Sequence, residues 1–427
     1  MSENGQSPKL SGYLFGRHAF LPYLGGAALA VWYRNPPLIA VCVFLLLLNA
    51  LILYWRRGAL ARLEPALALD GERCFAGDAF TVRASLLNGK WLPLVWLEWE
   101  FPATSGIAWE EDKRERYVIR FLWVMWHQRL SWTVRGHALR RGVYPLGRIV
   151  LRSGDGFRFS ESEKNVDMHR TVYVYPRLVP VKPPSVPLSL EWSAEGRRGG
   201  LYEDRLLIAG VRESGAGAEW RRVNWKATAR TGSLQINLYD PVAVRRLFIY
   251  ADVRGYAPPP STGEDPEREK AEKAKLEESF EAMLSVIASL AVSYSRQGVR
   301  IGFATNALDE AGRPVGAVEP SALPVPVLDK LAAMAPRAGA AGTRALEKLA
   351  SSGRLNATLF IFCFEIDEAL HRWQLKNRHL VPGLRIFYER DSKFAGRCGG
   401  AAVRLGALRA GDNGRAAAGA AAGGSGR

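Results

Sequence analysis

Cysteine and histidine are scarce in this sequence, and the common catalytic motifs are missing. Four cysteines among 427 residues exclude a disulfide framework, and the six histidines show no spacing typical of metal ligands. The sequence lacks the phosphate-binding loop G-x-x-x-x-G-K-[ST], the zinc motif H-E-x-x-H and any Cys-x-x-Cys pair. We therefore expect no cofactor and no catalytic residue, and predict that the protein is not an enzyme.

Acidic residues are outnumbered by basic ones. The chain has 58 Lys and Arg residues against 42 Asp and Glu residues, a net charge of +16. A hydrophobic fraction of 48% with 23% charged residues excludes disordered, collagen-like and coiled-coil chains. At roughly 150 residues per domain, the length suggests about three domains. The excess of positive charge suits a protein held beside anionic lipid.

Two apolar runs follow an N-terminal segment, residues 1–18. Residues 38–55 contain no charge, and at about 1.5 Å per residue they nearly match the roughly 30 Å hydrocarbon layer of a bilayer. Residues 19–33 form a shorter run, and the helix breakers of residues 34–37 connect the two. We predict a transmembrane helical hairpin over residues 19–57, with helices at 19–33 and 38–55. The alternatives are a buried core helix for the second run and a re-entrant or interfacial segment for the first.

Positive charges flank the hairpin on its two outer sides, whereas the short connector has only Arg34. Lys and Arg near a span mark the cytoplasmic side of a membrane. We therefore predict a multi-pass membrane protein with its soluble domains in the cytoplasm. A cleaved signal peptide is disfavoured, because no small-residue cleavage site follows a compact apolar segment. The flanking charges are Lys9, Arg17, Arg56, Arg57 and Arg62.

Residues 63–181 change to a period of two. Residues 80–86, for example, alternate apolar with polar or small side chains, and turn signals such as Asn88-Gly89 separate the runs. Many short strands with turns between them predict an antiparallel, β-sandwich-like domain.

Tryptophan is concentrated in this β-rich region, which holds seven of the 13 in the chain. Aromatic side chains in strands usually pack in a core, but they also form partner surfaces and membrane-facing rims. The run 121–126 is apolar on both faces, which indicates either a central strand or a docking surface. The seven are Trp91, Trp96, Trp99, Trp109, Trp123, Trp126 and Trp132.

A linker rich in proline and glycine, residues 182–200, leads to a segment in which basic and aromatic residues are interleaved. Arginine offers several planar donors and stacks on aromatic rings, so residues 210–240 are a candidate partner-binding site. The alternative is that Arg212 and Arg221 form local ion pairs with Glu213 and Glu219, with Trp225 in the core. The candidate residues are Arg212, Arg221, Trp225, Lys226 and Arg230.

The same segment resembles a family signature. Its residues Gly210-Val211-Arg212-Glu213, Gly217, Arg221, Trp225-Lys226 and Ala229-Arg230 are similar to the R-E-Y…G-D…R…W-K-x-x-A-R string of the MoxR-associated domain-of-unknown-function 58 proteins. Ser214 and Ala218 depart from it, standing where the family usually has Tyr and Asp. The resemblance implies two N-terminal spans, a β-rich insertion, a von Willebrand factor A-like α/β domain and a MoxR-type AAA+ ATPase as partner.

Strands and helices alternate after the signature, up to residue 390. Runs at 246–252, 299–304, 357–364 and 384–388 predict strands, and 267–297 predicts a long helix, which together indicate a doubly wound, mostly parallel sheet. The resemblance makes residues 201–390 the signature segment plus a von Willebrand factor A-like domain.

That fold often carries a D-x-S-x-S metal site after its first strand, and the corresponding residues here are 252–256. Both serine positions are lost, Arg254 replaces one, and Tyr256 stands at the other. We expect a degenerate site without metal, in which Asp252 pairs with Arg254. Cys363 lies in an apolar run and is expected to be a buried thiol. Residues 391–427, rich in Ala, Gly and Arg, predict a disordered basic tail.

These observations favour a non-enzymatic, membrane-anchored accessory or scaffold protein. By resemblance it lies in the bacterial cytoplasmic (inner) membrane and works with the ATPase in assembling or maturing another complex. Two alternatives stay open: a membrane-bound, metal-assisted hydrolase or transferase with an unrecognised site, and an envelope structural protein using its Trp-rich β domain. The expected partners are the membrane and the ATPase. No nucleic-acid fold signature is present, so specific nucleic-acid binding is not expected.

Overall fold

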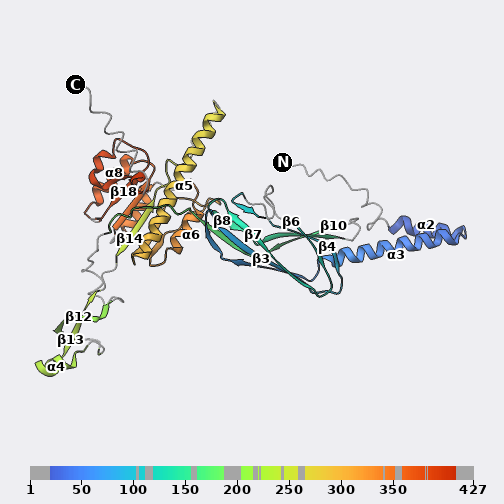
Figure 1. Ribbon diagram of the computed structural model, residues 1–427, viewed down its shortest axis with the longest axis horizontal. Helices are drawn as coiled ribbons and strands as arrows, with labels where there is room; N and C mark the ends of the chain where they lie inside the picture. Colours follow the sequence, from blue (N-terminus) through green and yellow to red (C-terminus); the bar gives the residue numbers. More distant parts are fainter. Residues whose placement is uncertain are drawn as a thin grey trace. The chain divides into compact units, whose positions relative to one another are not determined.

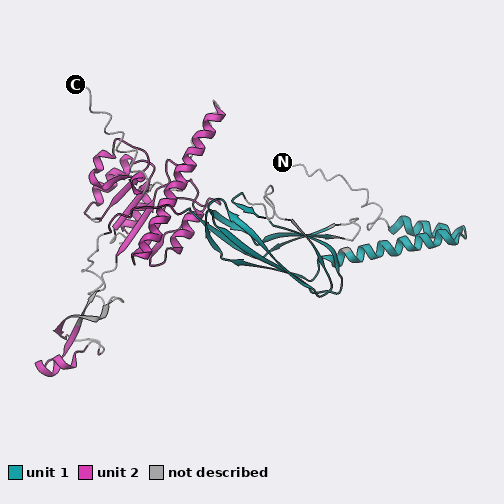
Figure 2. Cartoon of the chain, in the orientation of Figure 1, with its two compact units in different colours: residues 1–177 teal, residues 178–427 magenta. Residues whose placement is uncertain are grey.

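The computed structural model describes residues 20–101, 105–110, 119–154, 161–186, 203–214, 220, 223–241, 245–257, 265–339, 342–351, 358–379, 381 and 383–409. The chain divides into two compact units, residues 1–177 and residues 178–427 (Figure 2). The predicted N-terminal segment 1–18 lies outside the described residues, as do residues 187–200 of the predicted linker.

The first unit begins with two helices, α2 (Phe20–Trp32) and α3 (Pro36–Ala59), which lie side by side (Figure 1). The side chain of Asn35 caps α3 by accepting a hydrogen bond from the Leu38 amide at 3.4 Å. Among the described helices, α3 is the one long and apolar enough to cross a membrane. The 13 residues of α2 extend over about 20 Å, which is less than the hydrocarbon layer.

The apolar surface of α3 is largely uncovered. Only 17% of its most apolar window is buried within the protein, so the alternative of a buried core helix is wrong. Side chains around the helix are exposed, including Phe44 (63%) and Leu47 (66%). The last two turns differ, since Ile52 and Ala59 are buried and Trp55 packs against the core of the β-sheets.

Two four-stranded antiparallel sheets share that core, as the alternation of residues 63–181 predicts. Trp99, Trp109 and Phe101 are fully buried in it. A third sheet has three short strands, and Val172 and Val174 of its middle strand belong to the same core. In strand order the sheets contain β1 (Leu63–Asp70), β3 (Ala79–Asn88), β7 (Arg129–Ala138) and β5 (Ile107–Trp109); β10 (Glu161–Asp167), β9 (Arg148–Gly154), β4 (Leu94–Glu100) and β6 (Ile119–Val124); and β2 (Arg73–Phe75), β11 (Thr171–Tyr175) and β8 (Gly142–Pro145).

The apolar run 121–126 is not a central strand. Among the described strands β6 pairs only with β4 and therefore lies at a sheet edge. Trp123 on β6 is 74% exposed, and Trp126 in the following turn is 51% exposed. The tryptophans of this region thus divide between the core and the surface.

The second unit contains a six-stranded mixed sheet. Its strand order is β16-β15-β14-β17-β18-β19, and every neighbouring pair is parallel except β15 with β16. The strands are β14 (Arg246–Ala251), β15 (Arg300–Thr305), β16 (Val318–Ser321), β17 (Thr358–Cys363), β18 (Arg385–Tyr388) and β19 (Ala402–Arg404). All six residues of β17 are buried, as expected for a strand covered on both faces.

Helices lie on both faces of this sheet. Leu346 of α7 (Gly342–Ser351) and Trp373 of α8 (Glu368–Asn377) pack with Ile361 on one face. On the other face, Tyr294 of α5 (Pro266–Arg296) lies 6.2 Å from the Phe360 ring. Neighbouring strand residues point to opposite faces, which explains why Phe360 and Ile361 meet different helices. A further helix, α6 (Val325–Ala333), contacts α5 and β15.

The predicted boundary between the β-rich domain and the linker, at residue 181, is wrong, because residues on both sides of it pack on the second unit. The Val179 amide donates to Ser289 Oγ at 2.8 Å, and the Tyr294 hydroxyl donates to the carbonyl of Pro184. The Lys182 amide donates to the Leu408 carbonyl at 2.9 Å. Residues 178–186 are therefore part of the second unit.

The prediction of a disordered tail from residue 391 is wrong for residues 391–409. This stretch contains the short helices η3 (Gly396–Ala401) and η4 (Leu405–Leu408), and β19 extends the sheet beside β18. A few apolar side chains suffice to hold it, because Cys398, Leu405 and Leu408 are buried. Residues 410–427 lie outside the described residues.

A buried lysine joins α3 to the β-sheets. The ammonium of Lys90 donates to the carbonyl of Ala59 and, at 3.0 Å, to that of Ala61. Carbonyls at a helix C-terminus have no partner within the helix, and a cation near them is also favoured by the helix dipole. The Gly89 amide donates to the Arg62 carbonyl at 3.0 Å, which adds a second link.

Replacing Lys90 with Met should loosen this junction. The substitution leaves two carbonyls without their donor, and we expect a local loss of about 1–3 kcal/mol. Hydrogen–deuterium exchange of the full chain in detergent should show faster exchange of the Ala61 and Gly89 amides. Lys273→Met, at an exposed lysine of α5 (Pro266–Arg296) in the second unit, is the control and should leave both amides unchanged.

The pH dependence of stability gives a second measurement on Lys90→Met. Burial lowers the pKa of Lys90 from 10.5 to about 8, so the unfolded chain binds more protons than the folded one between these values. Stability contributed by this group therefore rises with pH from about 8 to 10.5. Urea unfolding should show this rise in the natural chain and a smaller one in Lys90→Met, and equal pH profiles would contradict it.

Candidate functional site

The predicted partner-binding residues lie around a small helix carried by a two-stranded ribbon. Strand β12 (Glu203–Glu213) pairs antiparallel with β13 (Gln235–Pro241), with Val211 opposite Asn237. Helix α4 (Trp225–Thr231) lies in the connection between them. We call β12, α4 and β13 the α4 module. Arg221 falls outside the described residues, as do Gly217 and Glu219.

Local capping explains where α4 begins and ends. The Asn224 side chain accepts from the Ala227 amide at 3.0 Å and also donates to Asn237 Oδ1 at 2.7 Å, which ties the start of the helix to β13. Gly232 ends the helix with φ of 73°, a left-handed conformation that glycine adopts without strain. Thr228 accepts from the Gln235 amide at 3.0 Å through its hydroxyl oxygen. The helix is therefore held to the ribbon by polar contacts.

The side chains of α4 are presented to solvent. No residue of α4 is buried, Trp225 is 64% exposed, and Trp220 just before the helix is 74% exposed. The alternative that places Trp225 in the core is therefore wrong. Arg212, Lys226 and Arg230 are exposed too, and within the described part of the chain none of them forms an ion pair. The structure brings Trp225, Lys226 and Arg230 together on one short helix.

Lys226 and Arg230 stand one helical turn apart. Like charges at this spacing destabilise a helix by about 0.2–0.5 kcal/mol, so the arrangement costs the fold a little. Two cations beside an exposed indole ring suit an acidic surface with an apolar contact at its centre. The α4 module therefore stays the predicted partner-binding site.

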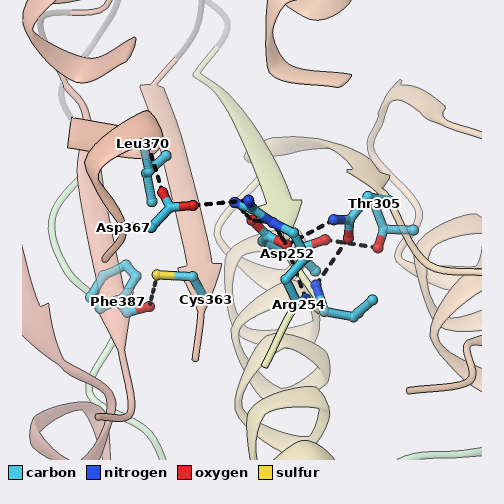
Figure 3. Close-up of polar contacts among 10 residues, drawn as sticks. Asp252, Arg254, Thr305, Cys363, Asp367, Leu370 and Phe387 are labelled. Atoms are coloured by element: carbon cyan, nitrogen blue, oxygen red, sulfur yellow. Dashed lines mark hydrogen bonds and ion pairs between the residues drawn. The ribbon is translucent and has the colours of Figure 1, made fainter. Parts of the chain in front are cut away.

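A second polar site lies at the carboxyl end of the mixed sheet. Asp252 follows the central strand β14, and its side chain is 3% exposed. The guanidinium of Arg254 faces both carboxylate oxygens: Nε lies 3.0 Å from each, and Nη2 lies 2.6 Å from Oδ2 (Figure 3). The expected Asp252–Arg254 pair is thus present in the structure.

Asn306 and Asp367 complete this site, which we call the Asp252 cluster. Asn306 follows β15, donates to Asp252 Oδ1 at 2.7 Å and accepts from the Val253 amide at 2.9 Å. Asp367 caps α8 and accepts from Nη1 of Arg254 at 2.9 Å (Figure 3). Parallel strands end at a common edge, so polar residues after β15 and β17 could have been grouped with Asp252 from the sequence. Asn306 and Asp367 were not among the residues predicted for this site.

The guanidinium occupies the position that a cation would take between the two carboxylates. Hydrogen bonding to Asp252 raises the pKa of Arg254 above its ordinary value, so the charge is permanent. A divalent ion would have to displace this group before it could reach the Asp252 oxygens. Among the described residues no cluster of three or more His, Cys, Asp or Glu side chains is placed to hold a metal. Tyr256 is fully buried beside Phe280 and Phe364.

The cysteines near this sheet are not activated. Cys363 is buried as expected, its thiol lies 3.7 Å from the Phe387 carbonyl, and burial raises its pKa (Figure 3). His371 contacts the Cys398 sulfur at 3.4 Å, but burial raises the pKa of this thiol as well. A nucleophilic cysteine needs a lowered pKa, so neither residue has the character of a nucleophile.

No family model and no curated protein matches the chain. Solved structures resemble parts of it only distantly. The CARDB domain of a Pyrococcus furiosus protein has 12% identity and a TM-score of 0.20, covering 26% of this chain and 91% of that one. A Vibrio harveyi GH20 exo-β-N-acetylglucosaminidase has 8% identity and a TM-score of 0.21, covering 78% and 68%. A Listeria innocua β-glucosidase has 9% identity and a TM-score of 0.16, covering 26% and 16%.

Replacing Arg254 with Gln should destabilise the carboxyl edge of the sheet, because the buried Asp252 carboxylate loses its counter-charge. Arg254 is partly exposed and Asn306 still donates to Asp252, so we expect a loss of about 2 kcal/mol rather than the larger cost of a fully buried pair. The Asp252 and Val253 amides should exchange roughly tenfold faster or more in the full chain.

A double variant tests whether the unpaired charge of Asp252 causes the faster exchange in Arg254→Gln. Asp252→Asn combined with Arg254→Gln removes both charges and should restore most of the protection. Arg313→Gln breaks an exposed pair with Asp309 and should leave these amides unchanged. A double variant as unprotected as Arg254→Gln alone would contradict the electrostatic explanation.

Proposed function

We propose that this chain is a non-enzymatic accessory protein anchored in a membrane by α3. The observation that carries the proposal is the exposed apolar surface of α3, a helix of 24 residues with mean hydropathy 2.6 in its most apolar window. Its last turn is built into the β-sheets through Ala59 and Lys90, which favours a retained anchor over a removed signal sequence. The finer form of the proposal is a helical hairpin in which α2 accompanies α3.

We further propose that the soluble parts lie in the cytoplasm of a bacterium, on the side marked by Arg56, Arg57 and Arg62. The mixed sheet, with helices on both faces, supports a von Willebrand factor A-like assignment for the second unit. Its Asp252 cluster is filled by Arg254, which favours a docking role over metal chemistry at this edge. The resemblance at the signature supports a MoxR-type AAA+ ATPase as the partner, with the α4 module as the contact surface.

Charges on the exposed face of α3 should prevent integration. Val43→Arg combined with Leu47→Arg places two arginines near the middle of the helix, at a cost of about 2.5–3.5 kcal/mol each. We expect most of this variant to leave the membrane fraction on alkaline carbonate extraction. Val43→Ala with Leu47→Ala is the control and should stay in the pellet. If the arginine variant also resists extraction, α3 is not the anchor.

Reversing the charges of the α4 module should weaken ATPase binding. Lys226→Glu with Arg230→Glu puts two acidic groups against an acidic partner, and like-charge contacts cost several kcal/mol, so recovered ATPase should fall at least about tenfold. The matched control is Arg344→Glu with Lys348→Glu, an exposed pair also one turn apart on α7. Equal recovery with both variants would remove the α4 module as the docking site.

A further inference from the structure

Four large apolar side chains are exposed in the first unit, on segments near the point where the β-sheets join the end of α3. Trp91 is 78% exposed, Trp123 74%, Trp126 51% and Met125 47%. We call these four residues the Trp91 rim. Isolated exposed apolar residues are common on protein surfaces, but three tryptophans and a methionine on adjoining segments form a patch that needs a partner.

The rim is carried by the loop 89–93 and by the end of β6 with the turn that follows it, and hydrogen bonds tie these two segments to each other. The Asn88 side chain is buried between them and donates to the Leu92 carbonyl at 3.0 Å and the Met125 carbonyl at 2.9 Å. The Asn88 amide donates to the Gln128 carbonyl at 3.0 Å, and the Trp91 and His127 rings meet edge to face at 5.6 Å. The rim is therefore a fixed part of the β-sheets.

The loop 89–93 is also fixed to the C-terminal end of α3. Lys90, next to Trp91, binds the carbonyls of Ala59 and Ala61, and Gly89 binds that of Arg62. Gly58 approaches Leu92 so closely that an added Cβ would lie 3.0 Å from its methyl group. The position of α3 along its axis thus determines the position of the rim.

Helix length places this junction at a membrane surface. If residues 38–55 occupy the hydrocarbon, about 27 Å of helix, the carbonyls of Ala59 and Ala61 fall within the headgroup layer. Trp91 is attached to those carbonyls through Lys90. Tryptophan is enriched at this depth, where its ring is buried and its N–H stays hydrated.

We propose that the Trp91 rim is immersed in the headgroup layer of the membrane that α3 crosses, so that the β-sheets are held at a set angle on the lipid surface. This inference rests on the anchor proposed above. The occupant is lipid rather than a protein, because the rim is continuous with the end of α3. Exposed arginines lie on the segments that adjoin the rim in sequence or through hydrogen bonds, as expected beside anionic headgroups: Arg57, Arg62 and Arg129.

The opposite end of the same unit supplies the control. Strand β7 starts at Arg129 beside the rim and ends at Ala138, about 30 Å further along. Leu139 follows it and is 60% exposed. A tryptophan placed at residue 139 should therefore lie in water while the rim lies in lipid.

The test uses the full chain in nanodiscs of phosphatidylcholine with one quarter phosphatidylglycerol, made with ordinary or 6,7-dibrominated acyl chains. Bromine quenches nearby indole fluorescence. The emission of the rim is obtained as the difference between the natural chain and Trp91→Phe/Trp126→Phe. The emission of a tryptophan at residue 139 is obtained in the same way, as the difference between Leu139→Trp and the natural chain. We expect brominated lipid to reduce the rim signal at least about twofold and to leave the signal from residue 139 unchanged.

The outcomes separate this inference from the anchor. If the chain stays in the nanodiscs but the rim signal is not quenched, the anchor stands and the rim faces water or a protein, so the inference fails. If both signals are quenched alike, the unit lies flat on the lipid and the rim has no special role. If the chain does not enter nanodiscs, the anchor fails and this inference falls with it. Circular dichroism of the Phe variant confirms its fold.

Discussion

The apolar surface of α3 is the constraint on which the other features of the first unit depend. Seven large apolar side chains along this helix are exposed, from Leu38 to Tyr54. Burying one such side chain is worth about 1.5–3 kcal/mol, so leaving seven in water costs an amount comparable with the 5–15 kcal/mol stability of a typical domain. A helix of this kind is stable where an apolar medium covers it. The contacts of its last turn then decide how the β-sheets stand relative to that medium.

Positive charge is used in two different ways in this protein. Lys90 and Arg254 are held by oxygen atoms of the protein itself, the first by helix carbonyls and the second by two carboxylates. Their role is to join elements that are distant in sequence. Lys226 and Arg230 have no such partner among the described residues and stand beside an exposed tryptophan. Cations of the first kind stabilise the fold, whereas cations of the second kind remain available for binding.

Much of the local structure followed from short-range patterns. The alternation of residues 80–86 predicted β3, and the uncharged run 38–55 predicted α3, because both signals depend only on neighbouring side chains. The Asp252–Arg254 pair could also be predicted from the sequence, since the two residues lie in one turn after a strand. Asn306 and Asp367 were missed because they join Asp252 only when three parallel strands end at one edge. The fold of residues 391–409 was missed because so few apolar side chains anchor it.

Composition and periodicity by themselves determined that the chain has an apolar segment of membrane-spanning length, a β-rich region and an α/β region. They also placed an arginine, Arg254, after the first strand of the α/β region. They could not separate buried from exposed tryptophan, because Trp99 and Trp123 occur in strands of similar apolar character. Tertiary structure decided that question: Trp99 lies on a strand paired on both sides and facing the core, while Trp123 lies on an edge strand and points away from it. Burial depends on which strands are neighbours, and pairing over long sequence separations leaves no local pattern to detect.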